Sequence, residues 1–176
     1  MESIDDPVEK DEVKMLTFSL DNVFYGVNVN QVREVKNFEG ATPVPCAPNY
    51  VKGVTNLRGE VVPVIDLRKR IGLSDRKEND AGIMVIVQEK HPIGVIVDSV
   101  IEVLTLQKKD IETGPESLIA DRSDGVIGIA KHDKDLIVLL DIIKVLSKDD
   151  ISNMKEDIKG FQIQVTNAKR QPATQI

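Results

Sequence analysis

The residues that could carry out catalysis in this chain are few and lie far apart. Asp66, Asp98 and Asp141 each follow a long apolar stretch, and two carboxylates brought together by the fold could act as a general acid and base. Capping explains two of them without catalysis, because Asp66 and Asp141 each precede a short run with helical spacing. We therefore predict helix caps at these two positions, with a carboxylate dyad as the alternative.

Histidine and cysteine give no better basis for catalysis or for metal binding. His91 and His132 lie in predicted turns among charged residues, which indicates solvated side chains. Cys46 lies in a proline-rich segment without a neighbouring histidine, so we expect a small apolar filler and not a nucleophile. The chain has no phosphate-binding loop, dinucleotide fingerprint or zinc-ligand spacing. We predict a protein that is not an enzyme and that uses no cofactor and no metal.

Residues 53–59, with the sequence GVTNLRG, differ from the rest of the chain. The segment places Asn56 and Arg58 at the tip of a predicted hairpin, with Gly53 and Gly59 at its two ends. An ordinary solvated turn is one interpretation. Arginine on a rigid turn is also typical of protein interfaces, because it combines five N–H donors with an apolar stem. We therefore treat this tip as a candidate partner-binding site.

The elements that must position these residues are hairpins of short strands. Asp21 and Asn22 form the first predicted turn, and Arg58 and Gly59 form the second. The segment 43–48 contains three prolines and must run extended outside a central ladder. The predicted strand pairs are 13–20 with 24–29, 51–57 with 60–67, 83–87 with 93–104, and 125–130 with 135–140.

Composition supports a strand-rich protein and excludes several partners. The chain has 23 valines and 19 isoleucines against 12 leucines, and β-branched side chains favour strands. Aromatic content is 3 %, so bases and sugars would find little to stack on. A net charge of −6 argues against nucleic acid and against an anionic membrane as the main partner. The chain has no signal region and no apolar run of the roughly 20 residues that span a bilayer, so we expect a cytoplasmic protein.

An internal repeat suggests that two similar β units make up the fold. Residues 25–35 (YGVNVNQVREV) and 93–103 (IGVIVDSVIEV) agree at six of eleven positions. Residues 60–67 (EVVPVIDL) and 135–142 (DLIVLLDI) repeat in the same order. Each half is about the size of a small SH3-like barrel, and closure would remove exposed strand edges. The repeat valines are candidates for a groove surface or for the core: Val29, Val32, Val35, Val97 and Val100.

Residues 25–35, 51–68 and 93–104 together resemble the CheW-type coupling proteins of bacterial chemotaxis. The resemblance covers about residues 13–147, and the block that contains GVTNLRG and PVIDL is its most specific part. It implies a mainly β fold of two five-stranded SH3-like barrels packed side by side, with short helices. We expect an acidic disordered arm at 1–12, one barrel at about 13–80, the other at about 81–147 with strands exchanged between them, and a polar tail at 148–176.

The resemblance also implies a function and a set of partner-binding residues. Such proteins are non-catalytic adaptors that join the cytoplasmic tips of methyl-accepting chemoreceptors to the chemotaxis histidine kinase at membrane-associated arrays. The arginine important for coupling falls on Arg58, and the acidic partner-binding residue falls on Glu34. Gly53 and Asn56 belong to the same block, Val32 and Val35 flank Glu34, and an apolar receptor groove between the barrels would include Val29, Val97 and Val100.

Three other interpretations remain open from the sequence. The chain could be the regulatory domain of a histidine kinase, or the coupling half of a protein fused to a receiver domain. It could also be a small-barrel RNA-binding module, although its acidity and few aromatic residues argue against that.

Overall fold

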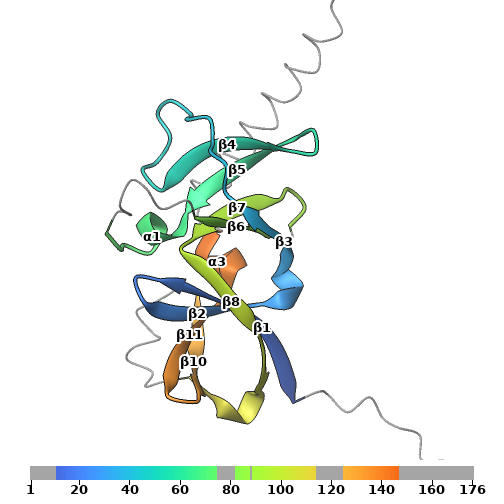
Figure 1. Cartoon of the computed structure of the whole chain (residues 1–176), viewed down its shortest axis with the longest axis vertical. Coiled ribbons are helices and arrows are strands. Elements are labelled where there is room, and N and C mark those ends of the chain that lie inside the picture. The colour runs from blue at the N-terminus through green and yellow to red at the C-terminus, as the bar shows by residue number, and fades with distance from the viewer. Residues whose placement is uncertain (1–10, 75–81, 88, 114–124, 147–176) are drawn as a thin grey trace, which may run out of the picture.

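The protein consists of two small β-sheets stacked along its long axis (Figure 1). The computed structural model describes residues 11–74, 82–87, 89–113 and 125–146. The predicted tail at 148–176 and most of the acidic arm at 1–12 lie outside these residues, although Glu12 already belongs to the first strand. The mainly β fold with few short helices is confirmed.

The lower sheet in Figure 1 has six strands in the order β8-β1-β2-β11-β10-β9. All neighbouring strands are antiparallel except β2 and β11, which are parallel. The strands are β1 (Glu12–Leu20), β2 (Val23–Asn28), β8 (Ser99–Gln107), β9 (Ile111–Glu112), β10 (Val126–His132) and β11 (Asp135–Leu140).

The upper sheet has five strands in the order β3-β6-β7-β5-β4, and β5 and β7 are its parallel pair. The order corresponds strand for strand to β8-β1-β2-β11-β10 of the lower sheet, which confirms the repeat inferred from the sequence. The strands are β3 (Val32–Asn37), β4 (Val51–Leu57), β5 (Glu60–Asp66), β6 (Ile83–Val87) and β7 (Ile93–Val97).

Each sheet closes on itself into a barrel. In the lower sheet, the edge strands β8 and β9 are joined directly by the 3-10 helix η2 (Lys108–Asp110). In the upper sheet, the chain leaves β3 and pairs at Thr42 with Val54 of β4, through N–H···O bonds of 2.8 and 2.9 Å. The Thr42–Val54 bonds satisfy edge groups of the upper sheet that would otherwise be left for another chain. We call these units the lower and the upper barrel.

The barrels exchange their third strands. After the β1–β2 hairpin, the 3-10 helix η1 (Val29–Gln31) leads to β3 in the upper sheet. After the β6–β7 hairpin, the chain crosses in the opposite sense, through Asp98, to β8 in the lower sheet. The sequence divided the barrels near residue 80 and allowed strands to be exchanged; in the structure each sheet takes strands from both sides of that position.

Buried aliphatic side chains form three clusters, one inside each barrel and one between the barrels. The interior glycines mark how crowded the barrels are, because a Cβ on Gly94 would lie 2.6 Å from the Met84 sulfur. The central cluster takes residues from both sheets, so burying it requires both barrels. Its members are Leu16, Phe18, Leu20, Val27, Ile65, Leu67, Val85, Val87, Ile93, Val95, Val97, Leu140, Ile142, Val145 and Leu146.

One short helix follows the second hairpin of each repeat, as the sequence predicted. Helix α1 (Leu67–Arg70) begins after Asp66, whose Oδ1 accepts a hydrogen bond from the Arg68 backbone N–H at 3.1 Å. Helix α3 (Ile142–Leu146) begins after Asp141, whose Oδ1 accepts from the Lys144 N–H at 3.2 Å. The predicted caps at Asp66 and Asp141 are therefore confirmed.

Closure of the upper barrel depends on Gly53, which faces Thr42 with φ of +145°. A Cβ at this position would lie 2.1 Å from the Thr42 carbonyl oxygen, so we expect Gly53→Ala to lower the free energy of unfolding by about 3 kcal/mol. Gly59→Ala is the control, since φ is +84° there but no atom lies within 4 Å of the new Cβ; it should cost about 1 kcal/mol. Urea denaturation measures the free energy of unfolding of both variants, and equal losses would contradict this account.

Candidate partner-binding site

The tip of the β4–β5 hairpin is a tight two-residue turn. Leu57 pairs with Glu60, and the residues between them have positive φ: +51° at Arg58 and +84° at Gly59. Two successive positive φ values define a type I′ turn, which matches the twist of a hairpin. Asn56 fastens the turn, because its Oδ1 accepts a hydrogen bond from the Gly59 N–H at 2.8 Å. Arg58 therefore projects from a turn whose backbone is held by hydrogen bonds.

Arg58 forms an ion pair with Glu34, 24 positions earlier in the chain. The distance between Arg58 Nη2 and Glu34 Oε2 is 2.9 Å, and the side chains are 70 % and 22 % exposed. Glu34 pairs across the sheet with Ile86 of the upper-barrel core, which places it on the interior face of β3. The ion pair thus joins the β4–β5 turn to the opposite edge strand of the same barrel. The structure brings together these two residues that the sequence singled out separately.

An ion pair this exposed adds little to stability, about 0.2–1 kcal/mol. The ion pair matters more for binding than for stability. Glu34 holds the guanidinium in place while most of the Arg58 side chain remains open to solvent. A charged group that is already oriented loses less side-chain entropy when a partner binds. The pair is therefore suited to recognition of an acceptor group on another protein.

Two β-bulges decide which repeat valines share a face. In β3 the register shifts between Val32 and Glu34, so that Val32 pairs with Val87 and Val35 with Val85. Both partners belong to the central cluster. The bulge therefore turns Val32 and Val35 toward the same face, although they are three residues apart.

The same device occurs in β8. The register shifts after Thr17, so that Val100 pairs with Phe18 and Val103 with Leu16, both of the central cluster. Val32 and Val100 are partly buried against that cluster, whereas Val35 and Val103 are 41 % and 51 % exposed. We call Val32, Val35, Val100 and Val103 the valine rim. Val103 was missed from the sequence, although its repeat mate Val35 was singled out.

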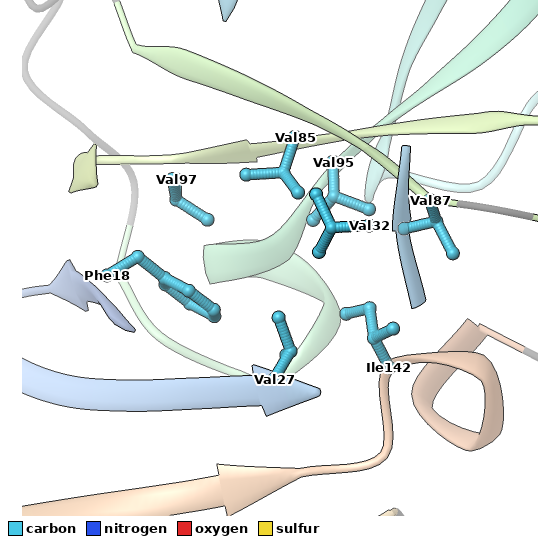
Figure 2. Close-up of a pocket in the computed structure, with 8 residues that line it drawn as sticks. All are labelled: Phe18, Val27, Val32, Val85, Val87, Val95, Val97 and Ile142. Carbon is cyan, nitrogen blue, oxygen red and sulfur yellow. The ribbon is translucent and has the colours of Figure 1, made fainter. Parts of the chain in front are cut away.

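Val97 is not at the surface. It is 1 % exposed and lines a small cavity between the barrels (Figure 2). The structure therefore places Val97 in the core and not at a surface open to a partner: it lies on the face of β7 that packs into the central cluster. Its repeat mate Val29 is partly buried in η1. The cavity has a volume of about 10 Å³ and an apolar lining, which leaves no room for a small-molecule substrate.

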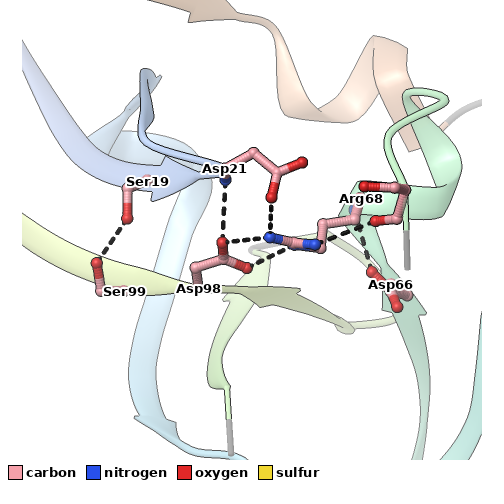
Figure 3. Close-up of polar contacts among 7 residues, drawn as sticks. Ser19, Asp21, Asp66, Arg68, Asp98 and Ser99 are labelled. Atoms are coloured by element: carbon pink, nitrogen blue, oxygen red, sulfur yellow. Dashed lines mark hydrogen bonds and ion pairs between the residues drawn. The ribbon is translucent and has the colours of Figure 1, made fainter. Parts of the chain in front are cut away.

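A charged cluster between the barrels was also missed from the sequence (Figure 3). Arg68 of α1 is 8 % exposed and pairs with both Asp21 and Asp98. The hydrogen bond that Arg68 donates to Asp98, assisted by the negative charges of Asp98 and Asp21 and opposed by burial, raises the pKa of the Arg68 guanidinium above its usual value. The sequence singled out Asp98 but carried no signal for its pairing with Arg68, because an arginine in a short basic helix is usually solvated.

The other side chains that could take part in catalysis or metal binding lie far from one another. The His132 and Asp133 side chains approach to 3.6 Å on an exposed turn, and Cys46 is exposed and not the filler that was expected. Among the described residues, no group of three or more His, Cys, Asp and Glu side chains could hold a metal ion. In the same part of the chain, no helix has the length and apolarity needed to cross a membrane.

Comparison with known proteins identifies a matching family. The model of the CheW-like domain matches residues 14–150. The chain is 35 % identical over 137 residues to the chemotaxis protein CheW of Bacillus subtilis, an alignment that covers 77 % of this chain and 88 % of that protein. It is 27 % identical to the chemotaxis protein CheW of Treponema pallidum, with coverage of 84 % and 89 %.

A solved structure has the same architecture. The crystal structure of the scaffolding protein TtCheW from Thermoanaerobacter tengcongensis superposes with a TM-score of 0.70 at 32 % sequence identity. The superposition covers 78 % of this chain and 94 % of that chain. The fold of two SH3-like units is thus shared with a scaffolding protein.

Burial separates the valines of the core from those available to a partner. Val97→Ala removes buried methyl groups from the central cluster and should lower the free energy of unfolding by about 2 kcal/mol. Val35→Ala, at a side chain that is 41 % exposed, should lower it by less than about 0.5 kcal/mol. Urea denaturation distinguishes the two, and equal losses would show that Val35 also belongs to the core.

Proposed function

The chain belongs to the CheW-like family, and on that premise we propose that it joins chemoreceptor tips to the chemotaxis histidine kinase as a non-catalytic adaptor. Its named relatives are chemotaxis proteins, and the structure it resembles is that of a scaffolding protein. The protein is accordingly a chemotaxis coupling adaptor. The partners, the binding surfaces and the lack of catalysis are the parts that we propose.

The observation that carries the proposal is the oriented Arg58 side chain. It stands 70 % exposed on a type I′ turn and is held by Glu34 at 2.9 Å. An arginine fixed in this way fits the role of an interface anchor, because its planar N–H donors recognise carboxylate or carbonyl groups directionally. We assign Arg58, Glu34, Asn56 and Gly53 to this site, the last two as supports of the turn and of barrel closure.

The valine rim is the proposed receptor surface. Its members come from β3 and β8, the two exchanged strands, and border the central cluster. A helical hairpin presents apolar side chains at regular spacing, which suits an apolar surface between two barrels. Ile101, at the β8 bulge and 46 % exposed, adds to the apolar area on this strand. We also assign Val29 to the margin of this surface, because it is partly buried in η1 directly before β3.

The proposed kinase contact uses a barrel face. A regulatory domain built from similar barrels could alternate with this protein in pseudo-symmetric contacts and so form closed rings. Each contact would be small and reversible, and the cooperativity of an array would come from multivalency. The place of action that follows is the cytoplasmic side of membrane-associated receptor arrays.

The other interpretations have less support. The relatives reported above are named chemotaxis protein CheW and the matching structure is that of a scaffolding protein, while a further match is named chemotaxis protein CheV3, from Helicobacter pylori. A net charge of −6 disfavours an RNA-binding module. Co-sedimentation with receptor-containing membranes, with and without the kinase, tests the proposal directly. Binding to neither receptor nor kinase would overturn it.

Substitutions of Arg58 and Glu34 distinguish direct contact of Arg58 with a partner from a purely structural role of the ion pair. Arg58→Ala should lower receptor-dependent kinase activation by roughly 30-fold, equivalent to about 2 kcal/mol, while the melting temperature hardly changes because the pair is exposed. The double variant Arg58→Glu with Glu34→Arg can re-form the pair but presents the opposite charge. It should stay inactive in the same assay; recovery of activity would mean that only the pair itself matters.

A charge placed on the valine rim tests the receptor surface. Val103→Asp and Val35→Asp should each reduce co-sedimentation with receptor membranes by roughly tenfold or more, because a carboxylate would lose its water in an apolar contact. Asn49→Asp adds the same charge at an exposed position before β4 and serves as the control. Unchanged binding of both rim variants would exclude the rim as the receptor surface.

A further inference from the structure

Arg68 lies at the centre of a polar cluster that we call the Arg68 cluster, made of Arg68, Asp21 and Asp98 (Figure 3). The guanidinium holds Asp98 at two points, with Nε–Oδ1 of 2.8 Å and Nη2–Oδ2 of 2.9 Å. Nη2 also donates to Asp21 Oδ1, and Nη1 donates to the Ser74 carbonyl oxygen at 3.1 Å. Asp98 Oδ2 accepts a further bond from the Asp21 backbone N–H at 3.0 Å.

The cluster connects the two barrels. Arg68 belongs to α1, which follows β5 of the upper barrel, and Asp21 lies in the β1–β2 turn of the lower barrel. Asp98 is the single residue between β7 of the upper barrel and β8 of the lower one. Its backbone N–H donates to the Ser19 carbonyl oxygen of β1 at 3.1 Å. The guanidinium therefore binds both the crossover and the barrel on its far side.

The other crossover, between β2 and β3, is held by a weaker polar contact. Between β2 and β3 the chain passes through three residues of η1, where Gln31 Nε2 donates to Asp141 Oδ1 at 3.1 Å. Asn30, the repeat mate of Asp98, is exposed there. A hydrogen bond from a neutral donor to a carboxylate is weaker, and constrains the geometry less, than a two-point contact between guanidinium and carboxylate. Of the two crossovers, the one at Asp98 therefore has the stronger directional contact.

Apolar packing alone leaves that angle poorly determined. The central cluster consists mostly of valine, leucine and isoleucine, and hydrophobic attraction depends on buried area and not on direction. Exchanged strands hold the barrels together, but short crossovers can still absorb changes in backbone dihedral angles and act as hinges. A directional contact at the one-residue crossover removes this freedom.

We propose that the Arg68 cluster is a clasp that sets the angle between the two barrels, and that Arg68 is the positioning residue. Buried ion pairs often add little net stability, because desolvation offsets the attraction, yet breaking one is costly and some fix a single arrangement. A clasp of this kind orients β3 and β8, and the valine rim on them, in one geometry. The inference concerns the conformation of the chain itself and does not depend on the identity of any partner.

The test is the distribution of distances between the barrels. With Cys46→Ser as background, spin labels on cysteines at Asn37 of β3 and Thr105 of β8, both exposed, report the separation by pulsed electron paramagnetic resonance on the full chain. Arg68→Lys keeps the charge but loses the planar two-point contact. We expect a distribution roughly twofold broader than that of the unsubstituted protein, as for a released hinge.

Controls distinguish orientation from stability. Val62→Ala removes a fully buried side chain inside the upper barrel, away from the clasp, and should lower the melting temperature while the distribution stays narrow. A narrow distribution in Arg68→Lys, or equal broadening in Val62→Ala at a matched loss of stability, would overturn the proposal. If Arg68→Lys does not fold, Asp21→Asn decides: a broader distribution supports the clasp, and an unchanged one excludes it.

Discussion

The exchange of third strands is the constraint on which the rest of the structure depends. Strand β3 closes the upper barrel and β8 closes the lower one, although each follows a hairpin of the other barrel. Each sheet is thus completed by a strand that leaves the other barrel, and side chains of both exchanged strands pack against a common central cluster. A small β unit buries too little surface to be stable alone, and exchange joins two of them into one cooperative fold. The surface between the barrels is a direct product of this arrangement.

Much of the fold could be predicted because local rules determine it. The turn at Arg58 and Gly59, the caps at Asp66 and Asp141, and the repeat of hairpins all follow from short-range sequence and are present in the structure. The excess of β-branched residues gave the fold class for the same reason. These features require no knowledge of which strand pairs with which over long distances.

The faces of the valines could not be predicted, because two β-bulges reverse the alternation of side chains. A pattern of period two places Val32 and Val35 on opposite faces, and the extra residue at Arg33 returns them to one face. Val97 resembles the rim valines in sequence but belongs to a strand that is buried along its whole length. The Arg68 cluster is hidden for another reason: its three members are brought together by tertiary packing between residues 21, 68 and 98.

The two repeats have the same backbone at equivalent hairpin turns but different charges on the side chains there. Arg58 and Asp133 occupy equivalent turns with φ of +51° and +52°, and Glu34 corresponds to Glu102. In the upper barrel the pair is a cation and an anion at 2.9 Å, whereas the equivalent positions of the lower barrel carry two acids. Like charges cannot form the same contact, so the two barrels present unlike surfaces on a common backbone. The two barrels therefore share one backbone plan but carry different charges at equivalent hairpin tips, so a surface that recognises the Arg58 tip would not recognise the Asp133 tip in the same way.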